Sequence, residues 1–188
     1  MKGTKKQFSR EAFKSLRQTG AITATSKYSV EKMLSVIDFN KDLTIVEFGV
    51  GNGVVTTKLL NRISPGSRLV ALEINENLYN LVSTILPSDD DRISFHKYSA
   101  FDIDNLLDDL GIGEVDYFIS TLPLTMFSKE DNIKLMTKMR HYLKPSGKYV
   151  QIQYSPLKYP MVRRYFPKVK VSLVLANIPP AIVYFCSL

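Results

Sequence analysis

Apolar runs of strand length alternate with helical stretches along the chain from residue 43 onward. This alternation predicts an α/β fold around a mostly parallel sheet. Strands are expected at residues 43–48, 68–72, 91–96, 115–120 and 148–154. Helical segments are expected at residues 54–62, 77–86, 102–110 and 129–143, and the last of them should end at the Pro- and Gly-containing sequence of residues 144–147.

The rhythm changes near the end of the chain. Residues 168–175 and 181–187 both resemble strands, and residues 176–180 between them leave no room for a helix. Two strands joined by so short a link must be antiparallel neighbours. The pattern therefore predicts a Rossmann-like sheet of seven strands in the order 3-2-1-4-5-7-6, with strand 7 antiparallel.

A helical segment of residues 1–40 is expected to precede the main domain, residues 41–188. Phe8, Phe13 and Leu16 recur at helical spacing, and basic residues fall largely on the opposite face. A second helix is expected from Ser29 to Ile37, with Ser29 as its N-cap.

Composition narrows the class of protein. The 188 residues are 45% hydrophobic, enough for one domain with a short appendage. No run of 18 apolar residues occurs that could span a bilayer, and the polar N-terminus lacks the apolar core of a secretory signal. The single cysteine, Cys186, excludes an internal disulfide, fits a reducing cytoplasm and is expected to be buried. Two histidines and one cysteine make no convincing metal site, so we expect no metal.

The net charge of +7 indicates that the protein tolerates or seeks anionic surfaces such as nucleic acid or acidic lipid. The excess is concentrated at the N-terminus. Six basic residues lie within the first seventeen positions: Lys2, Lys5, Lys6, Arg10, Lys14 and Arg17. On charge alone, the simplest interpretation is that they form a solvated helix face.

The sequence EFGVGNG, residues 47–53, follows the first strand and opens a helix. Gly49, Gly51 and Gly53 let a ligand approach the backbone without an intervening Cβ atom. A dinucleotide fold would place its third glycine one residue later and would not place an acid such as Glu47 beside a pyrophosphate. An acid at this turn suits the ammonium of a methionine moiety, which predicts S-adenosylmethionine as the cofactor.

Glu73 ends the second strand, twenty residues beyond Gly53. Its carboxylate is expected beside the crevice at the glycine turn, where two ribose hydroxyls of the cofactor can donate to it. Ile74, the next residue, is expected to bind the cofactor at the same place. The third strand is followed by Ser99, Ala100 and Phe101, where an acid that binds the adenine amino group would be expected. The adenine is then expected to be held by backbone groups of Ala100 and Phe101 or by Asp102, which is equally a candidate N-cap.

The loop after the fourth strand, Ser120 to Leu124 (STLPL), lies where the transferable methyl would point. Enzymes that methylate adenine or glutamine amines usually carry Asn/Asp-Pro-Pro-aromatic here. STLPL offers carbonyl oxygens but neither the amide nor the ring. The loop therefore favours an acceptor other than a planar nucleobase amine.

Taken together, these motifs resemble class I S-adenosylmethionine-dependent methyltransferases, specifically the bacterial phospholipid N-methyltransferases related to rRNA adenine dimethylases. Four stretches carry the likeness, with Ala24 in place of a usual proline: GAITATS (residues 20–26), VEFGVGNGVV (46–55), STLPL (120–124) and NIPPAIVY (177–184). The resemblance implies methylation of the amine of phosphatidylethanolamine or a related amino-lipid. It also implies peripheral attachment of a cytoplasmic protein to the inner face of the membrane through the N-terminal helix, although that helix could equally pack on the domain as a lid.

The acceptor amine must lose a proton, because a lipid amine with a pKa near 10 is protonated at neutral pH. Candidate groups are Tyr28, Tyr154 and the carbonyl oxygens of Ser120 and Leu122, and Arg163 with Arg164 could hold a lipid phosphate. Two alternatives stay open: an RNA adenine N6-methyltransferase, disfavoured by STLPL, and a small-molecule methyltransferase or non-catalytic cofactor-binding module.

Overall fold

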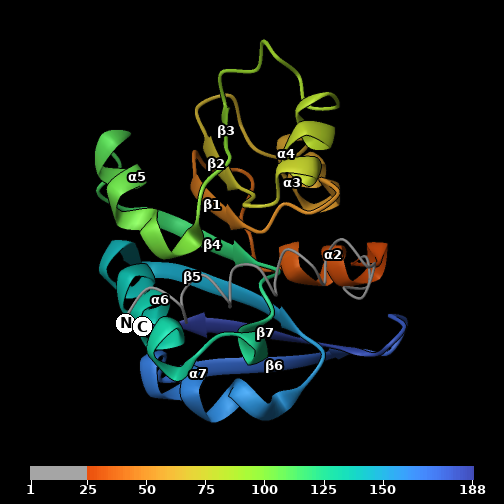
Figure 1. Ribbon diagram of the computed structural model, residues 1–188, viewed down its shortest axis with the longest axis vertical. Helices are drawn as coiled ribbons and strands as arrows, with labels where there is room; N and C mark the ends of the chain where they lie inside the picture. Colours follow the sequence, from red (N-terminus) through yellow and green to blue (C-terminus); the bar gives the residue numbers. More distant parts are fainter. Residues whose placement is uncertain (1–24) are drawn as a thin grey trace, which may run out of the picture.

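The computed structural model describes residues 25–188, with a seven-stranded sheet at its centre (Figure 1). The strand order, β3-β2-β1-β4-β5-β7-β6, confirms the prediction. Only β7 runs antiparallel to its neighbours, β5 and β6. The strands are β1 Thr44–Phe48, β2 Arg68–Leu72, β3 Ile93–His96, β4 Val115–Ser120, β5 Leu143–Gln153, β6 Lys168–Val174 and β7 Ala181–Ser187.

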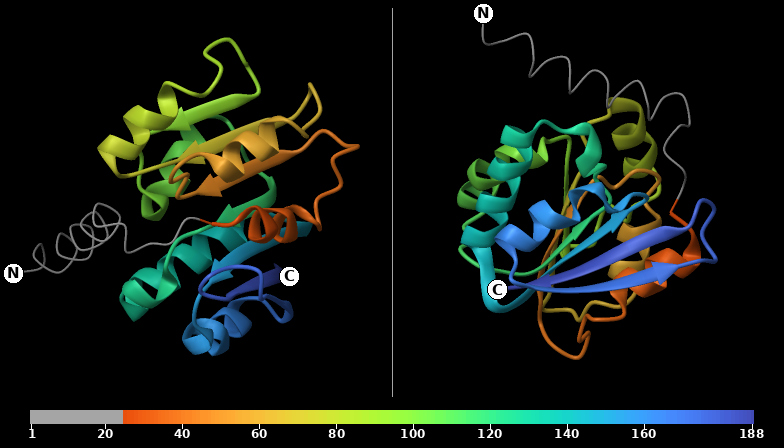
Figure 2. Two further views of the ribbon diagram at one scale, coloured as in Figure 1. Left: turned by 90° about the vertical axis from the view of Figure 1, so that its right-hand side faces the viewer. Right: turned by 90° about the horizontal axis from the view of Figure 1, so that it is seen from below.

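Helices cover both faces of the sheet (Figures 1 and 2). Those on one face are α2 Lys27–Leu34, α3 Val54–Leu60 and α4 Glu76–Ser83. Those on the other are α5 Ile103–Asp109, α6 Lys129–Tyr142 and α7 Tyr159–Tyr165. Three 3-10 turns lie between elements: η1 Ala100–Asp102, η2 Leu124–Met126 and η3 Pro156–Lys158.

The central strands are buried on both faces, which is why they read as nearly continuous apolar runs. In β1, Ile45 packs toward α2 and α3 while Phe48 packs toward α5 and α6. Phe48 also stacks on Phe118 of β4, with ring centroids 5.5 Å apart. Cys186 is fully buried, as predicted, and burial raises the pKa of its thiol.

Helix α2 begins two residues earlier than predicted. Its N-cap is Ser26, whose hydroxyl accepts from the backbone N–H of Ser29 at 3.3 Å, so the prediction of Ser29 as the cap was wrong. Val30 and Met33 of this helix are fully buried against the sheet. A boundary at residue 40 remains our proposal, and the basic helix expected around Phe8 and Leu16 lies outside the described residues.

Strand β5 also begins earlier than predicted, at Leu143, directly after α6. The sequence Lys144–Gly147 lies within the strand instead of separating it from the helix, and the β4–β5 register shifts between Val115 and Tyr117. Gly147 permits this path, because a Cβ there would lie 2.9 Å from the carbonyl oxygen of Asp116. Helix α7 was not predicted.

The loops that carry the predicted chemistry follow β1, β2, β3 and β4, so they meet at the carboxyl edge of the parallel strands. Because β7 is antiparallel, the β6–β7 turn also lies at this edge, next to the end of β5. Among residues 25–188 no helix is long and apolar enough to cross a membrane.

Candidate functional site

The turn between β1 and α3 depends on its three glycines. Gly49, Gly51 and Gly53 have φ values of 78°, 64° and 81°, in the left-handed region that other residues rarely adopt. The backbone N–H groups of Gly49 and Val50 donate to the carbonyl oxygen of Leu72, at 2.9 and 3.1 Å. The turn is thereby anchored to the end of β2, and Glu47, fully buried in β1, lies two residues before Gly49.

Glu73 joins the ends of β1 and β2. One carboxylate oxygen accepts from the N–H of Gly51 at 2.9 Å, and the other accepts from the N–H of Asn75 at 2.8 Å. The side chain is 1% exposed and lines a cavity. Since a carboxylate oxygen can accept more than one hydrogen bond, these two contacts are compatible with a ligand hydroxyl at Glu73.

The cavity has a volume of about 380 Å³, within the range of small-ligand sites. Seven of the predicted site residues line it: Gly49, Glu73, Ile74, Ser99, Ala100, Phe101 and Leu122. Glu47, Gly51, Gly53 and Ser120 lie in the adjoining strand ends and turn without lining it.

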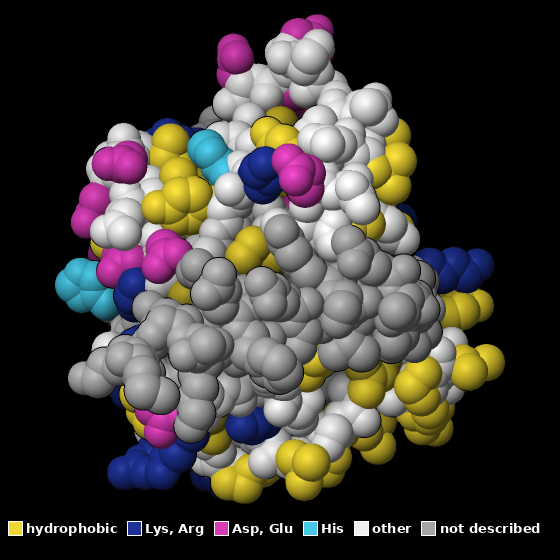
Figure 3. All heavy atoms as spheres, in the orientation of Figure 1, with side chains coloured by type: hydrophobic (Ala, Val, Ile, Leu, Met, Phe, Trp, Pro, Cys, Tyr) yellow, Lys and Arg dark blue, Asp and Glu magenta, His cyan; other side chains and the backbone are white. Residues whose placement is uncertain are grey.

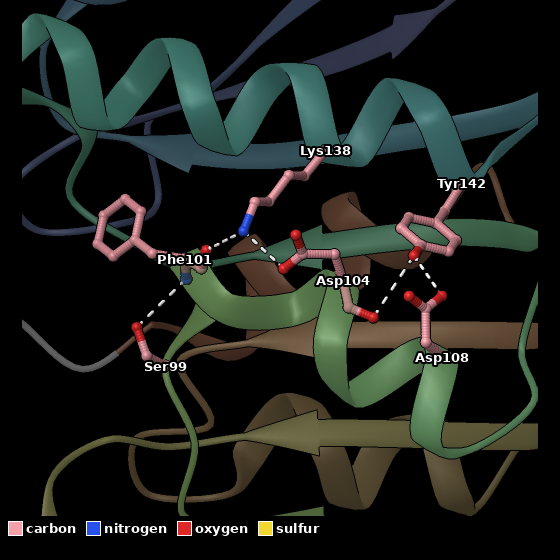
Figure 4. Close-up of polar contacts among 6 residues, drawn as sticks. All are labelled: Ser99, Phe101, Asp104, Asp108, Lys138 and Tyr142. Carbon is pink, nitrogen blue, oxygen red and sulfur yellow. Dashed lines mark hydrogen bonds and ion pairs between the residues drawn. The ribbon is translucent and has the colours of Figure 1, made fainter.

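The end of the cavity beyond β3 is formed by η1. Ser99, which stands where an acid was expected, caps this turn, and its hydroxyl accepts from the N–H of Phe101 at 3.3 Å (Figure 4). Asp102 lines the cavity and precedes α5 without a side-chain capping hydrogen bond. Lys138 of α6 donates to the carbonyl oxygen of Phe101 and pairs with Asp104, which ties η1 to the helix opposite.

Sequence reasoning missed the contribution of α6 and its preceding turn. Phe127, Asp131, Lys134 and Lys138 all line the cavity, and the Phe127 ring packs edge-on against Phe101 with centroids 5.0 Å apart. The three α6 residues are spaced three and four apart, which places them on one helix face. That spacing was a visible signal, although an ordinary solvent-exposed helix face has the same pattern.

Two side chains of β5 hold the STLPL loop in place. The carbonyl oxygen of Leu122 accepts from the side-chain amides of Gln151 and Gln153, at 3.0 and 2.8 Å. Ser120 is fully buried, and its hydroxyl accepts from the N–H of Leu122 at 3.3 Å. Two donors occupy both lone pairs of the Leu122 oxygen, which argues against the role of substrate acceptor that we predicted for it.

The two candidate tyrosines lie outside the cavity. Tyr28 is 55% exposed on α2, with the ammonium of Lys27 5.3 Å from its ring centroid. Tyr154 follows β5, where burial raises the pKa of its hydroxyl while hydrogen bonds with Asn177 and Thr25 oppose the rise. Arg163 and Arg164 are exposed on α7.

The cavity suits an adenosyl-containing ligand. Its wall combines Gly49 of the glycine turn, a buried carboxylate at Glu73 and apolar groups at Ile74 and Phe101. A family model described as "Methyltransferase domain" matches residues 45–147. The chain belongs to the methyltransferase domain family.

A curated relative of this methyltransferase is an ornithine lipid N-methyltransferase from Singulisphaera acidiphila. The two are 31% identical over 145 residues, which cover 76% of this chain and 74% of the relative. Solved structures confirm the fold at much lower identity. Precorrin-6y C5,15-methyltransferase from Geobacter metallireducens has a TM-score of 0.67 at 17% identity and covers 87% of this chain and 89% of its own.

A third relative bears on the cofactor. The 1,6-didemethyltoxoflavin-N1-methyltransferase of Burkholderia thailandensis has a TM-score of 0.68 at 14% identity, covers 94% of this chain and 85% of its own, and contains S-adenosylhomocysteine. The family and such neighbours show that this protein is an S-adenosylmethionine-dependent methyltransferase. Within residues 25–188 no group of three or more His, Cys, Asp or Glu side chains could hold a metal ion.

Proposed function

We propose that this methyltransferase transfers a methyl group to the amine nitrogen of a membrane amino-lipid, either phosphatidylethanolamine or an ornithine lipid. The observation that carries the proposal is a contact between two stretches that resemble lipid methyltransferases. Asn177, at the start of NIPPAIVY, accepts from the N–H of Ser26, at the end of GAITATS, at 3.1 Å. The likeness to an ornithine lipid N-methyltransferase supports the same acceptor class.

The residues around the cavity divide between holding the cofactor and positioning the acceptor. We assign Glu73 to the ribose hydroxyls, Glu47 with the glycine turn to the methionine moiety, and Ile74 with Phe101 to the adenine. S-adenosylmethionine, when bound, supplies an electrophilic methyl group. The protein's main task is therefore alignment of the acceptor nitrogen with that group.

The acceptor side differs from that of a nucleobase methyltransferase. The STLPL loop has neither an amide side chain nor an aromatic ring to hold a planar amine, and the Leu122 oxygen is already occupied by two amide donors. An aliphatic amine needs no stacking partner, but it must be deprotonated before it attacks. This loop favours a flexible aliphatic amine over adenine.

Tyr154 is better suited to binding than to proton abstraction. Since the pKa of its hydroxyl is raised by burial, the group stays protonated at neutral pH and can donate a hydrogen bond. We propose that Tyr154 contacts headgroup oxygens at the carboxyl edge and that the amine's proton leaves to solvent. Tyr28, more than half exposed on α2, is the weaker candidate.

The acceptor can be tested directly with purified protein and methyl-labelled S-adenosylmethionine. Detergent micelles containing phosphatidylethanolamine or ornithine lipid would be compared with transcribed RNA. We expect label in one or both lipids and none in RNA, and its loss in the variant Glu73→Gln. Label in RNA, with neither lipid methylated, would contradict the proposal.

The proposed substrate implies attachment to the cytoplasmic face of a membrane. The basic N-terminal segment is the sequence's candidate for this attachment, since each basic residue near an anionic surface contributes about 1 kcal/mol. Flotation with vesicles of phosphatidylcholine and phosphatidylglycerol would test it, by comparing the full chain with a variant that lacks residues 1–18. Equal flotation of the two proteins would remove that segment from the attachment.

A further inference from the structure

Apolar side chains are exposed together around the β6–β7 hairpin and the neighbouring η3 turn. Leu175 and Ile178, in the hairpin turn, are 74% and 86% exposed, and Leu173 on β6 is 65% exposed. Leu157 of η3 is 78% exposed and Val171 of β6 is 43% exposed. These five residues form what we call the hairpin patch.

The members of the hairpin patch lie on neighbouring elements. Val171 and Leu173 alternate with Ser172 along β6, so they share the face of the sheet that α7 covers. The η3 turn leads into α7 on that same face, and the turn with Leu175 and Ile178 closes the hairpin. In Figure 3, hydrophobic side chains gather over the free end of this hairpin and along its lower side.

The patch lies at the edge of the sheet where the cofactor cavity opens. The β6–β7 turn meets the end of β5, and η3 contacts η2, which immediately precedes the cavity-lining Phe127. Asn177 lies inside the turn and is 1% exposed, whereas the adjacent Ile178 projects outward. A surface pressed against the hairpin patch would therefore face the acceptor side of the site.

The charge around the patch selects the kind of surface. The sequence contains no Asp or Glu after Asp131. Lys158 directly follows Leu157 in η3, and Lys170 directly precedes Val171 in β6. Arg163, Arg164 and Lys168 extend the basic surface along α7 to the start of β6, away from the hairpin turn. Exposed apolar side chains with basic residues beside them match an anionic bilayer, whose acyl region accepts the former and whose headgroups attract the latter.

We propose that the hairpin patch inserts into the headgroup region of an anionic membrane and sets the carboxyl edge of the sheet against the lipid. This contact is separate from the N-terminal segment and rests on the proposed lipid substrate. It shortens the path of a headgroup amine to the cavity, because the lipid need not leave the bilayer completely. Leu173, Leu175 and Ile178 would bury their exposed surface on binding.

The test uses full-length protein and vesicles of phosphatidylcholine with phosphatidylglycerol. The triple variant Leu173→Ser, Leu175→Ser, Ile178→Ser removes three exposed apolar groups. The matched control, Leu81→Ser with Ile85→Ser, alters residues 54% and 57% exposed at the opposite end of the sheet. We expect the triple variant to bind vesicles at least about tenfold more weakly and the control to bind as the unaltered protein does. Circular dichroism would establish that both variants are folded.

The protein should bind weakly to vesicles that lack phosphatidylglycerol, and salt should weaken its binding to vesicles that contain it. Unchanged binding of the triple variant would overturn the proposal, as would failure of the unaltered protein to bind vesicles. A third result would also overturn it: if the unaltered protein is a dimer and the triple variant is a monomer with unchanged vesicle binding, the patch is a self-association surface. Methylation in detergent micelles separates the two proposals. If the triple variant loses vesicle binding but still methylates lipid in micelles, the result supports the hairpin patch as a membrane contact. If the unaltered protein methylates no lipid in micelles, the result rejects the lipid substrate alone.

Discussion

The side-chain oxygen of Asn177 accepts a hydrogen bond from the hydroxyl of Ser29 at 2.9 Å, although the two residues are 148 positions apart in the sequence. The same oxygen accepts from the N–H of Ser26, and the amide nitrogen of Asn177 donates to the carbonyl of Pro179 at 2.7 Å. One buried side chain thus joins the start of α2 to the β6–β7 turn.

Replacing Asn177 with Ala should lower the free energy of unfolding by about 2–4 kcal/mol, because the substitution removes the acceptor of two donors at a buried position. Urea unfolding followed by circular dichroism would measure the loss. Asn80→Ala, at an exposed position of α4, is the control and should change stability by less than about 0.5 kcal/mol. A similar small change for both variants would show that the Asn177 contacts add no net stability.

Much of the fold follows from the sequence because hydrophobic periodicity reflects burial on the two faces of a sheet. The start of α2 does not follow, since Ser26 and Ser29 are both good caps. Ser29 instead meets Asn177, a partner that only the folded chain brings near. Likewise, the path of Lys144–Gly147 depends on the close approach of Gly147 to the backbone of Asp116 in the neighbouring strand β4. No local sequence pattern reveals this approach.

Three glycines, one of them in the glycine turn, allow the cost of backbone strain to be separated from the cost of crowding. Gly53 has a φ of +81°, and a Cβ there would lie 3.3 Å from Ile85; Gly111 has a φ of +65° with nothing within 4 Å; Gly113 has neither feature. We expect Ala to be nearly neutral at Gly113, to cost about 1–2 kcal/mol at Gly111 and to cost at least as much at Gly53. Thermal or urea unfolding of the three variants gives the order, and a neutral Gly111→Ala would refute the strain argument.

Glu73→Gln should weaken S-adenosylmethionine binding by roughly 10- to 100-fold, because the charged acceptor for the ribose hydroxyls becomes a neutral amide. Isothermal titration calorimetry measures the affinity. Glu76→Gln is the matched control: it lies three residues later, and its ion pair with Lys97, 2.8 Å long, is exposed. Equal affinities of the two variants would remove Glu73 from the cofactor site.

The site was predictable where chemistry dictates residue type and not where it depends on packing. Carboxylates and glycines at strand ends marked Glu73 and the glycine turn. Lys138 was not marked, because its contact with the carbonyl of Phe101 depends on how α6 lies over η1 (Figure 4). Tyr154 was correctly placed at a strand end, but sequence could not show that its partners are Asn177 and Thr25 and not the cavity.

Tyr142 should make stability depend on alkaline pH. Its hydroxyl donates to Asp108 at 2.7 Å, and this bond, with burial, raises the pKa of Tyr142 to about 12 (Figure 4). In the unfolded chain the pKa is about 10, so the stabilisation is complete below pH 10 and is lost as pH rises toward 12. Between pH 10 and pH 12, Tyr142→Phe should reduce the decline in the free energy of unfolding by up to about 2 kcal/mol. Urea unfolding at several pH values in this interval would measure the difference. An unchanged slope would contradict the assignment.

Gln153 of β5 supports the acceptor loop. Gln153 donates to the Leu122 carbonyl at 2.8 Å, and Gln153→Met keeps the length of the side chain while removing the donor. If alignment of the acceptor depends on this loop, kcat for lipid methylation should fall at least about tenfold. Affinity for S-adenosylmethionine should stay within about threefold, because Glu73 and the glycine turn are untouched. Ser155→Ala, two residues later, removes the hydroxyl that accepts from the N–H of Leu157 at the start of η3, and it should leave both quantities unchanged. A parallel loss of cofactor affinity in Gln153→Met would instead indicate a general disturbance of the cavity.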